Sequence, residues 1–277
     1  MKRIAFVVAA FAALAVVAVS ADAAAVGLSQ APNIKVKNGY STNWAGYAIP
    51  ASGGVSDVIG TWTVPAVQQC GSTTTTTTTG TNVRAQVASN GKAGHGKPSS
   101  TTTGYSSAWV GIDGYNSNTV EQIGTEQDCI NGAPRYYAWY EMYPQYPTNL
   151  STGSFPVNPG DSITAEVKYT SGNSFTLTLT NKSQKWSFAT NQTSSSAQRS
   201  SAEWILEAPW SGRVLPLADF GVADFSGSGA TILGTKGSIS NWKYDAITMI
   251  TTSGQTKAYP SGLTSGGSAF DVTWAHQ

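Results

Sequence analysis

Charged residues are scarce in this sequence. Only 11% of its 277 residues are Asp, Glu, Lys or Arg, against about 25% in typical globular proteins. Lys and Arg total 16 and Asp and Glu total 15, so the charge balance gives no reason to expect a nucleic-acid or membrane partner. A surface with few carboxylates changes little in charge at low pH, and we expect acid to cost the protein little stability.

Histidine is nearly absent, which excludes the common histidine-dependent hydrolases. His95 lies in a stretch of low complexity, and His276 is the penultimate residue. A Ser-His-Asp or Cys-His site needs a histidine held in a rigid frame, and a zinc hydrolase of the HExxH kind needs two on one helix. Nucleotide-binding glycine motifs and the Asp-Thr-Gly of aspartic peptidases are also missing. We expect no cofactor and no metal, so catalysis would have to use carboxylates, amides and hydroxyls.

Residues 1–25 are typical of a secretory signal peptide. A basic pair precedes an apolar run over residues 4–19, and the Ala-Asp-Ala at residues 21–23 offers a cleavage site. The apolar run is shorter than the ~20 residues that a membrane-spanning helix needs. We therefore predict a secreted protein, whose only two cysteines, Cys70 and Cys129, form a disulfide.

Residues 26–40 form a short leader, which is either a remnant pro-segment or a flexible N-terminus. We expect a single domain over residues 41–277. A stretch rich in Thr and Gly at about residues 68–103 has few large apolar side chains and predicts a mobile loop inserted into this domain. The disulfide would attach the start of the loop to the body.

Alternation of apolar and polar residues predicts short strands through the rest of the chain. Residues 163–169 and 175–179 alternate in this way, with a hairpin turn at residues 170–173. No sustained helical period occurs, apart from a turn or two near residues 197–202. Short strands with Gly- and Pro-rich turns favour an all-β fold, a two-sheet antiparallel β-sandwich.

The segment "AEWILE" (residues 202–207) predicts a strand that bears two carboxylates. Its alternation places Glu203, Ile205 and Glu207 on one face and Ala202, Trp204 and Leu206 on the other. The second face is expected to pack into the core. The simplest explanation of the first face is solvation, and Glu203 stays open between solvation and a supporting hydrogen-bonding role.

Two further segments supply polar groups among aromatic residues. "YYAWYEMYP" (residues 136–144) places Tyr137, Trp139, Glu141 and Tyr143 on one strand face, which is a common construction of a binding cleft. A packing face with Glu141 at its rim is the alternative. A predicted strand over residues 119–125 contains Gln122, which by itself indicates no function.

Taken together, these segments resemble the glutamic peptidases, or eqolisins. The resemblance runs in chain order through "NWAGY" (43–47), "TWTVP" (61–65), "WVGIDG" (109–114), "YYAWYEMYP", "AEWILE" and "LADFG" (217–221). It implies a lectin-like (concanavalin-like) β-sandwich, as the alternation also favours. The leader is shorter than the pro-segments of fungal members, which favours a member from outside the fungi.

The resemblance implies a catalytic dyad of Gln122 and Glu207. Gln127 is a weaker candidate for the glutamine, because the preceding loop is about one residue shorter than in fungal members. The resemblance also implies a cleft lined by six residues: Trp44, Trp109, Asp113, Trp139, Glu141 and Tyr143.

The implied function is that of a secreted, monomeric acid endopeptidase acting on polypeptides. Glu207 would be the general base on water and Gln122 would stabilise the tetrahedral intermediate. Donor hydrogen bonds are expected to hold the pKa of Glu207 modestly below its usual value. The alternative is a β-sandwich glycoside hydrolase or lectin-like carbohydrate-binding protein that uses Glu141 and Glu207.

Overall fold

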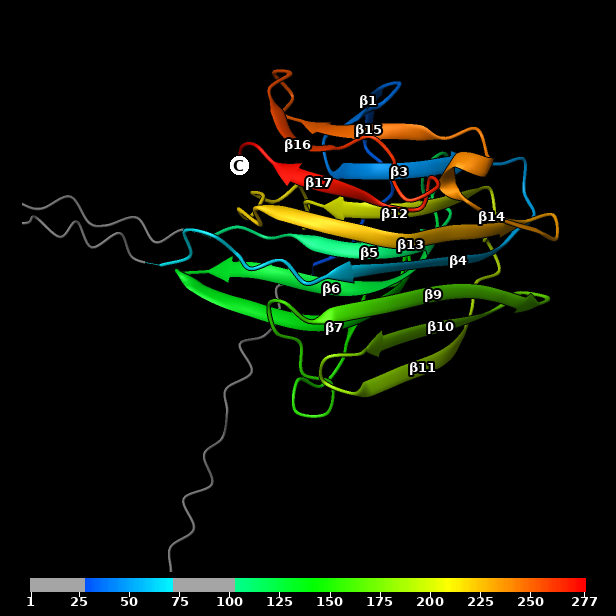
Figure 1. Cartoon of the computed structure of the whole chain (residues 1–277), viewed down its shortest axis with the longest axis horizontal. Helices are drawn as coiled ribbons and strands as arrows, with labels where there is room; N and C mark the ends of the chain where they lie inside the picture. Colours follow the sequence, from blue (N-terminus) through cyan, green and yellow to red (C-terminus); the bar gives the residue numbers. More distant parts are fainter. Residues whose placement is uncertain (1–27, 72–102) are drawn as a thin grey trace, which may run out of the picture.

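The computed structural model describes residues 28–71 and 103–277 (Figure 1). The expected signal peptide and the threonine run at residues 73–79 lie outside the described residues. Within these residues the chain is almost entirely β-structure, with one short 3-10 helix, η1 (Ile239–Asn241).

Seven strands form one sheet, which we call the site sheet. Their spatial order is β8 (Thr148–Asn149), β7 (Ala133–Tyr143), β6 (Val120–Ile130), β5 (Ser107–Ile112), β12 (Ser201–Glu207), β3 (Trp44–Pro50) and β15 (Asp245–Ile250). The second sheet, the back sheet, contains β11 (Trp186–Thr193), β10 (Ser174–Asn181), β9 (Ser162–Ser171), β4 (Val55–Thr63) and β13 (Val222–Ile232), followed by β14 (Thr235–Ser238), β17 (Phe270–Trp274) and β16 (Thr256–Pro260).

The two sheets are joined along one edge. Strand β15 pairs with β3 of the site sheet and with β16 of the back sheet. The short strands β1 (Lys35–Lys37) and β2 (Tyr40–Ser41) pair with each other, and β2 also pairs with β15 in the parallel direction. The other pairings between the described strands are antiparallel, so the predicted β-sandwich is confirmed.

The main core lies between the sheets. Trp204 projects from β12 into this core, where its indole Nε1 donates a hydrogen bond of 2.7 Å to the Ile59 carbonyl on β4. Ala202 and Leu206 share this face of β12, as the alternation of "AEWILE" predicts. The predicted alternating strands are β9 and β10, whose apolar residues are buried at every second position.

The opposite face of the site sheet is also covered. A second apolar cluster lies on it, made of Trp44, Ala48, Trp109, Tyr115, Val120, Trp139, Ile205 and Ile247. Glu203 and Glu207 project from this same face and have no exposed surface. Of the two alternatives for Glu203, solvation is therefore wrong, because segments distant in sequence cover the strand on both sides.

The chain near residues 197–202 is not helical. Asp113 holds it in another conformation, since its carboxylate accepts backbone hydrogen bonds from residues 198, 199 and 200, each of 2.7 to 2.8 Å. Arg199 adopts a positive φ of 52°, and Ser201 already belongs to β12. The predicted turn of helix is wrong because these donors bind a side chain rather than helical carbonyls.

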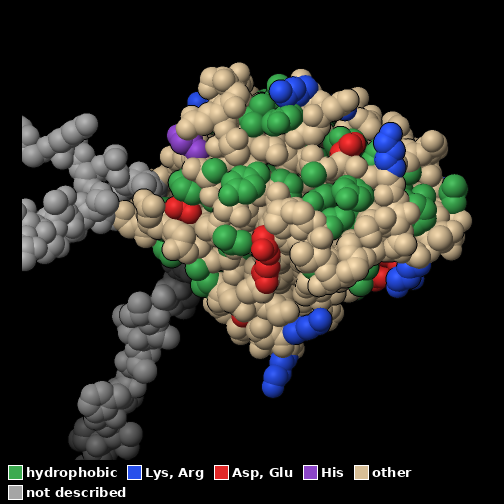
Figure 2. Space-filling model, turned by 45° about the horizontal axis from the view of Figure 1, so that its top comes forward, with side chains coloured by type: hydrophobic (Ala, Val, Ile, Leu, Met, Phe, Trp, Pro, Cys, Tyr) green, Lys and Arg blue, Asp and Glu red, His purple; other side chains and the backbone are tan. Residues whose placement is uncertain are grey.

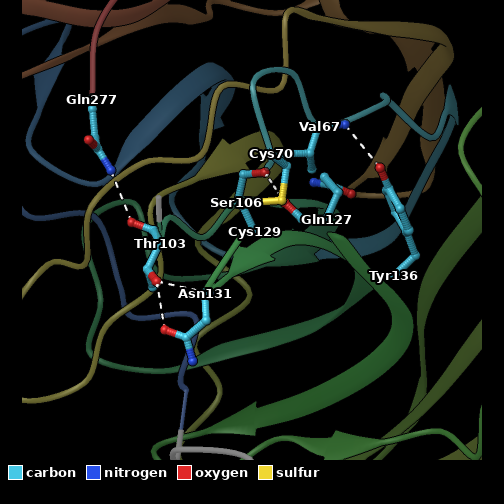
Figure 3. Close-up of a disulfide and its surroundings, with 9 residues drawn as sticks. All are labelled: Val67, Cys70, Thr103, Ser106, Gln127, Cys129, Asn131, Tyr136 and Gln277. Atoms are coloured by element: carbon cyan, nitrogen blue, oxygen red, sulfur yellow. Dashed lines mark hydrogen bonds between the residues drawn. A yellow bond between two sulfur atoms is a disulfide. The ribbon is translucent and has the colours of Figure 1, made fainter. Parts of the chain in front are cut away.

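A disulfide joins Cys70 to Cys129 near the end of β6, with Cα atoms 5.5 Å apart (Figure 3). The prediction of this bridge is confirmed. Thr103 lies close by, because its hydroxyl accepts a hydrogen bond of 3.0 Å from the Asn131 backbone. Both ends of the segment between residues 71 and 103 are therefore attached to the same end of β6.

Few charges lie on the surface. Figure 2 shows one face, on which charged side chains are scattered among uncharged ones. Eight acidic residues in the described part of the chain are buried: Asp113, Glu121, Glu126, Asp128, Glu141, Asp161, Glu203 and Glu207. No helix in the described part of the chain is long and apolar enough to cross a membrane.

Candidate active site

Gln122 and Glu207 project from the covered outer face of the site sheet. Gln122 lies on β6 and Glu207 ends β12, and β5 runs between these strands. Neither side chain has exposed surface. Because side chains alternate along β6, Gln122 shares this face with Val120 of the outer apolar cluster.

Gly124, two residues after Gln122, makes room for Trp109 of the neighbouring strand. It lies opposite Trp109 of β5, and a Cβ atom there would lie 2.5 Å from the Trp109 Cβ and 2.4 Å from the Ala108 carbonyl oxygen. The absent side chain lets Trp109 lie across β6. The Trp109 indole Nε1 then donates a hydrogen bond of 3.0 Å to Glu207 Oε2.

The pKa of Glu207 is raised well above its usual value. Burial is the main cause and the charge of Glu141 adds to it, whereas hydrogen bonds from Asn43, Trp109 and the Ala31 backbone lower it. The Asn43 bond joins Nδ2 to Glu207 Oε1 at 3.2 Å. The expected depression of this pKa is therefore wrong, because the cost of burial exceeds the effect of the donors.

Glu141 is the second carboxyl group of the site. It receives a hydrogen bond of 2.9 Å from Gln122 Nε2 and one of 2.5 Å from Ser29 Oγ. Burial raises its pKa to about 8, and these donors only partly offset the shift. While the leader covers Glu141, this raised pKa favours the protonated form of its carboxyl group at acidic pH.

The leader crosses the site as an extended segment. Residues 28–31 are buried, so this part of the leader is packed against the domain. Ser29 and Trp210 exchange two backbone hydrogen bonds, of 3.0 and 2.8 Å. The Ala31 carbonyl accepts a hydrogen bond of 2.9 Å from Trp44 Nε1.

Gln122 and Glu207 contact the two polar atoms of one peptide group. Gln122 Nε2 donates a hydrogen bond of 2.7 Å to the Gln30 carbonyl oxygen. The N–H of the next residue, Ala31, is near enough to the Glu207 carboxyl group to lower its pKa. An amide and a carboxyl group thus lie on opposite sides of the peptide bond between Gln30 and Ala31.

Comparison with known proteins decides the family. The profile of the Peptidase A4 family matches residues 42–274. The chain belongs to the Peptidase A4 family.

Characterised relatives agree with this family. The chain is 34% identical to aspergillopepsin-2 of Aspergillus niger over 205 residues, which are 69% of this chain and 65% of the relative. It is 39% identical to scytalidopepsin B of Scytalidium lignicola over 104 residues, 36% of this chain and 38% of that protein. The chain thus spans slightly less than two thirds of the first relative's length and over a third of the second's.

Solved structures show the same fold. Scytalido-glutamic peptidase with a transition-state analogue inhibitor aligns with a TM-score of 0.63 at 24% identity, over 84% of this chain and 98% of that one. Aspergilloglutamic peptidase from Aspergillus niger aligns with a TM-score of 0.55 at 30% identity, over 62% of this chain and 99% of that one.

Trp44, Trp109 and Trp139 lie together in this Peptidase A4 member, all within the outer apolar cluster. The ring centroids of Trp44 and Trp109 are 5.0 Å apart in an edge arrangement. Trp139 donates a hydrogen bond of 3.0 Å to Ser107 Oγ, and Tyr143 packs against the cluster while partly exposed. The structure thus gathers the predicted aromatic residues around Gln122 and Glu207.

Asp113 and Gln127 occupy different positions. The Asp113 carboxylate binds the backbone before β12, so its oxygens are already used within the protein. Gln127 projects from the opposite face of β6 to Gln122, where its Oε1 lies 3.4 Å from Thr125 Oγ1. It therefore lies on the other side of the sheet from Glu207.

Three contributors to the site were missed in the sequence. Asn43 is the first residue of the "NWAGY" motif, but the sequence gave no sign that its side chain reaches Glu207. Glu126 is two alternations along β6 from Gln122 and so shares its face, a signal that could have found it. Trp210 follows β12 and pairs with the leader, a contact that no local pattern encodes.

Proposed function

We propose that this protein is a secreted, monomeric acid endopeptidase with Gln122 and Glu207 as its catalytic dyad. The observation that carries the proposal is their placement on the two sides of one peptide group, at the Gln30 carbonyl and the Ala31 N–H. Membership of the Peptidase A4 family supports a peptidase, and the many buried carboxyl groups fit work in acid. An origin outside the fungi stays a prediction.

The geometry supports a direct attack of water on the substrate. Glu207, when ionised, takes a proton from water and returns it to the leaving nitrogen, next to which it already lies. Gln122 donates to the carbonyl oxygen that becomes negatively charged, a role worth ~3 kcal/mol in comparable sites. Trp109 and Asn43 donate to Glu207 and favour its ionised form. When the leader leaves and water enters the cleft, Glu207 becomes less buried, and the burial that opposes its ionisation decreases.

Glu141 is best assigned to positioning. It fixes the Gln122 amide and accepts a hydrogen bond of 2.9 Å from the Gln30 backbone N–H. Trp44 Nε1 and Asn43 Nδ2 donate hydrogen bonds to the carbonyl oxygen of Ala31. We place Asp113 in a structural role and keep Trp109, Trp139 and Tyr143 as walls of the cleft.

The carbohydrate alternative uses Glu141 and Glu207 as its pair of carboxyl groups. It gives no role to Gln122, and the family assignment does not favour it. Digests of a denatured protein and of a β-glucan at several acidic pH values separate the two functions.

Substitution of the dyad tests the proposal. Glu207→Gln keeps the shape and removes the base, so hydrolysis of a denatured protein should become undetectable. Gln122→Ala should lower kcat about 10²–10³-fold, and Glu141→Gln should have a smaller effect. Gln127→Ala is the matched control, because this side chain lies on the other face of β6. Wild-type rates in Glu207→Gln with an unchanged fold, or cleavage of glycans alone, would refute the proposal.

A further inference from the structure

The leader follows the cleft as a bound polypeptide would. On the amino side of the peptide bond between Gln30 and Ala31, Ser29 pairs in the antiparallel direction with Trp210. The Ser29 hydroxyl and the Gln30 N–H both donate to Glu141. The segment thus adds an extended strand whose main chain supplies the hydrogen bonds, a common mode of peptide recognition.

The carboxyl side of the same bond is held equally closely. Asn43 Nδ2 lies 3.2 Å from the carbonyl oxygens of both Ala31 and Pro32, and Asn43 Oδ1 accepts a hydrogen bond of 2.8 Å from the Ile34 N–H. The Asn33 N–H donates to the Gly114 carbonyl at 3.0 Å. The cleft therefore binds backbone groups from residue 29 to residue 34 in one continuous register.

The Gln30 side chain enters a polar pocket. Its Nε2 donates a hydrogen bond of 2.5 Å to Glu126 Oε1, and Gln30 and Glu126 are each 1% exposed. Burial, followed by the charge of Asp128, raises the pKa of Glu126 well above its usual value. This pocket offers an acceptor to an amide donor, whereas an aliphatic side chain would leave the buried Glu126 oxygen unpaired.

We propose that the protein cuts its own chain between Gln30 and Ala31, with Glu126 selecting glutamine on the amino side of the bond. This inference rests on the proposed function and deepens it. The oxygen of a water molecule adds to the Gln30 carbonyl carbon while Glu207 takes a proton from it. The bond to the Ala31 nitrogen then breaks, the nitrogen receives that proton, and the products are a carboxyl group on Gln30 and an amine on Ala31.

Two features favour cleavage over permanent occupancy. The scissile bond already lies between Gln122 and Glu207, and its attachment to the domain gives it a high effective concentration. It also lies outside residues 42–274, the region matched by the family profile. Cleavage separates the residues up to Gln30 from residues 31–34, which then leave the cleft when a polypeptide substrate replaces them. The raised pKa of Glu207 in the covered state predicts that self-cleavage is slower than later turnover.

The test follows the N-terminus of the chain produced with its leader. After incubation in mild acid, intact mass and N-terminal sequencing should identify Ala31 as the new first residue of the wild type, and Glu207→Gln should keep the leader. The rate should be first order and unchanged over a tenfold range of protein concentration. Cleavage of Glu207→Gln at the same bond, or a rate proportional to concentration, would overturn self-cleavage.

A second arm tests the pocket. Gln30→Leu should slow self-cleavage about tenfold or more, whereas Gln255→Leu, at an exposed turn, should not. The processed enzyme should cut the peptide LSQAPNI between Gln and Ala. Its kcat/KM on the peptide LSLAPNI should be lower by a factor of about ten or more. Equal rates on both peptides would overturn the role of Glu126.

The two proposals fail in different ways. If the protein hydrolyses a denatured substrate while its N-terminus is not Ala31, self-cleavage at this bond is wrong and the peptidase function stands. If it cleaves neither itself nor a denatured substrate or LSQAPNI, the proposed function is wrong, and the further inference falls with it.

Discussion

Glu121→Gln should make the protein less sensitive to rising pH. Glu121 lies on β6 with no exposed surface. Burial, followed by the charge of Asp113, raises its pKa to about 9, and Ser194 and the backbone only partly offset this shift. Gln has nearly the same shape as the protonated carboxyl group and carries no charge. It removes the proton equilibrium without opening a cavity.

The sign follows from the direction of the shift. A carboxyl group whose pKa is higher in the folded state contributes its full stability below the unfolded pKa, near 4.5. That stability is lost as pH rises toward the folded pKa. The loss is ~1.4 kcal/mol per pH unit for one group. Between pH 5 and pH 7 the wild type should lose about 3 kcal/mol through Glu121 alone, and the Gln variant should not.

Urea unfolding followed by tryptophan fluorescence at pH 4, 5, 6 and 7 measures this difference. The free energy of unfolding of the variant minus that of the wild type should rise by about 3 kcal/mol from pH 5 to pH 7. Asp271→Asn, at an exposed carboxylate, is the control and should show no such trend. Parallel pH curves for wild type and Glu121→Gln would mean that Glu121 is ionised in the fold, which would refute the reasoning.

Two further predictions concern the fold around the site. Gly124→Ala should destabilise the protein by about 1–3 kcal/mol, because the new Cβ would lie 2.4 Å from the Ala108 carbonyl oxygen and 2.5 Å from the Trp109 Cβ. Thermal unfolding measures this loss. An unchanged Tm would show that β5 can move aside at Ala108 and Trp109. The paired substitution of Cys70 and Cys129 by Ala should cost about 2–5 kcal/mol with little loss of activity at low temperature, since the bridge lies at the end of β6; inactivation of a still-folded variant would contradict this.

Local sequence patterns determined the strands and the faces of their side chains. A period of two is a property of the extended backbone itself, so "AEWILE" already separated Trp204 from Glu207, and "YYAWYEMYP" placed Trp139 beside Glu141. Ordered motifs then indicated Gln122 and Glu207. The prediction of the disulfide followed because a chain that is expected to be exported and has two cysteines has one intramolecular pairing to make.

Only the tertiary structure decided what covers each face. Burial of Glu203 and the upward pKa shift of Glu207 depend on segments far away in sequence, and no period within β12 encodes them. The same holds for the position of Glu207 on the Gln122 side of β6 rather than on the Gln127 side, because only assembly of the sheets brings these strands together. Residues 29–34 show no periodicity, and their backbone groups bind Trp210, Glu141 and Asn43, which lie outside this segment.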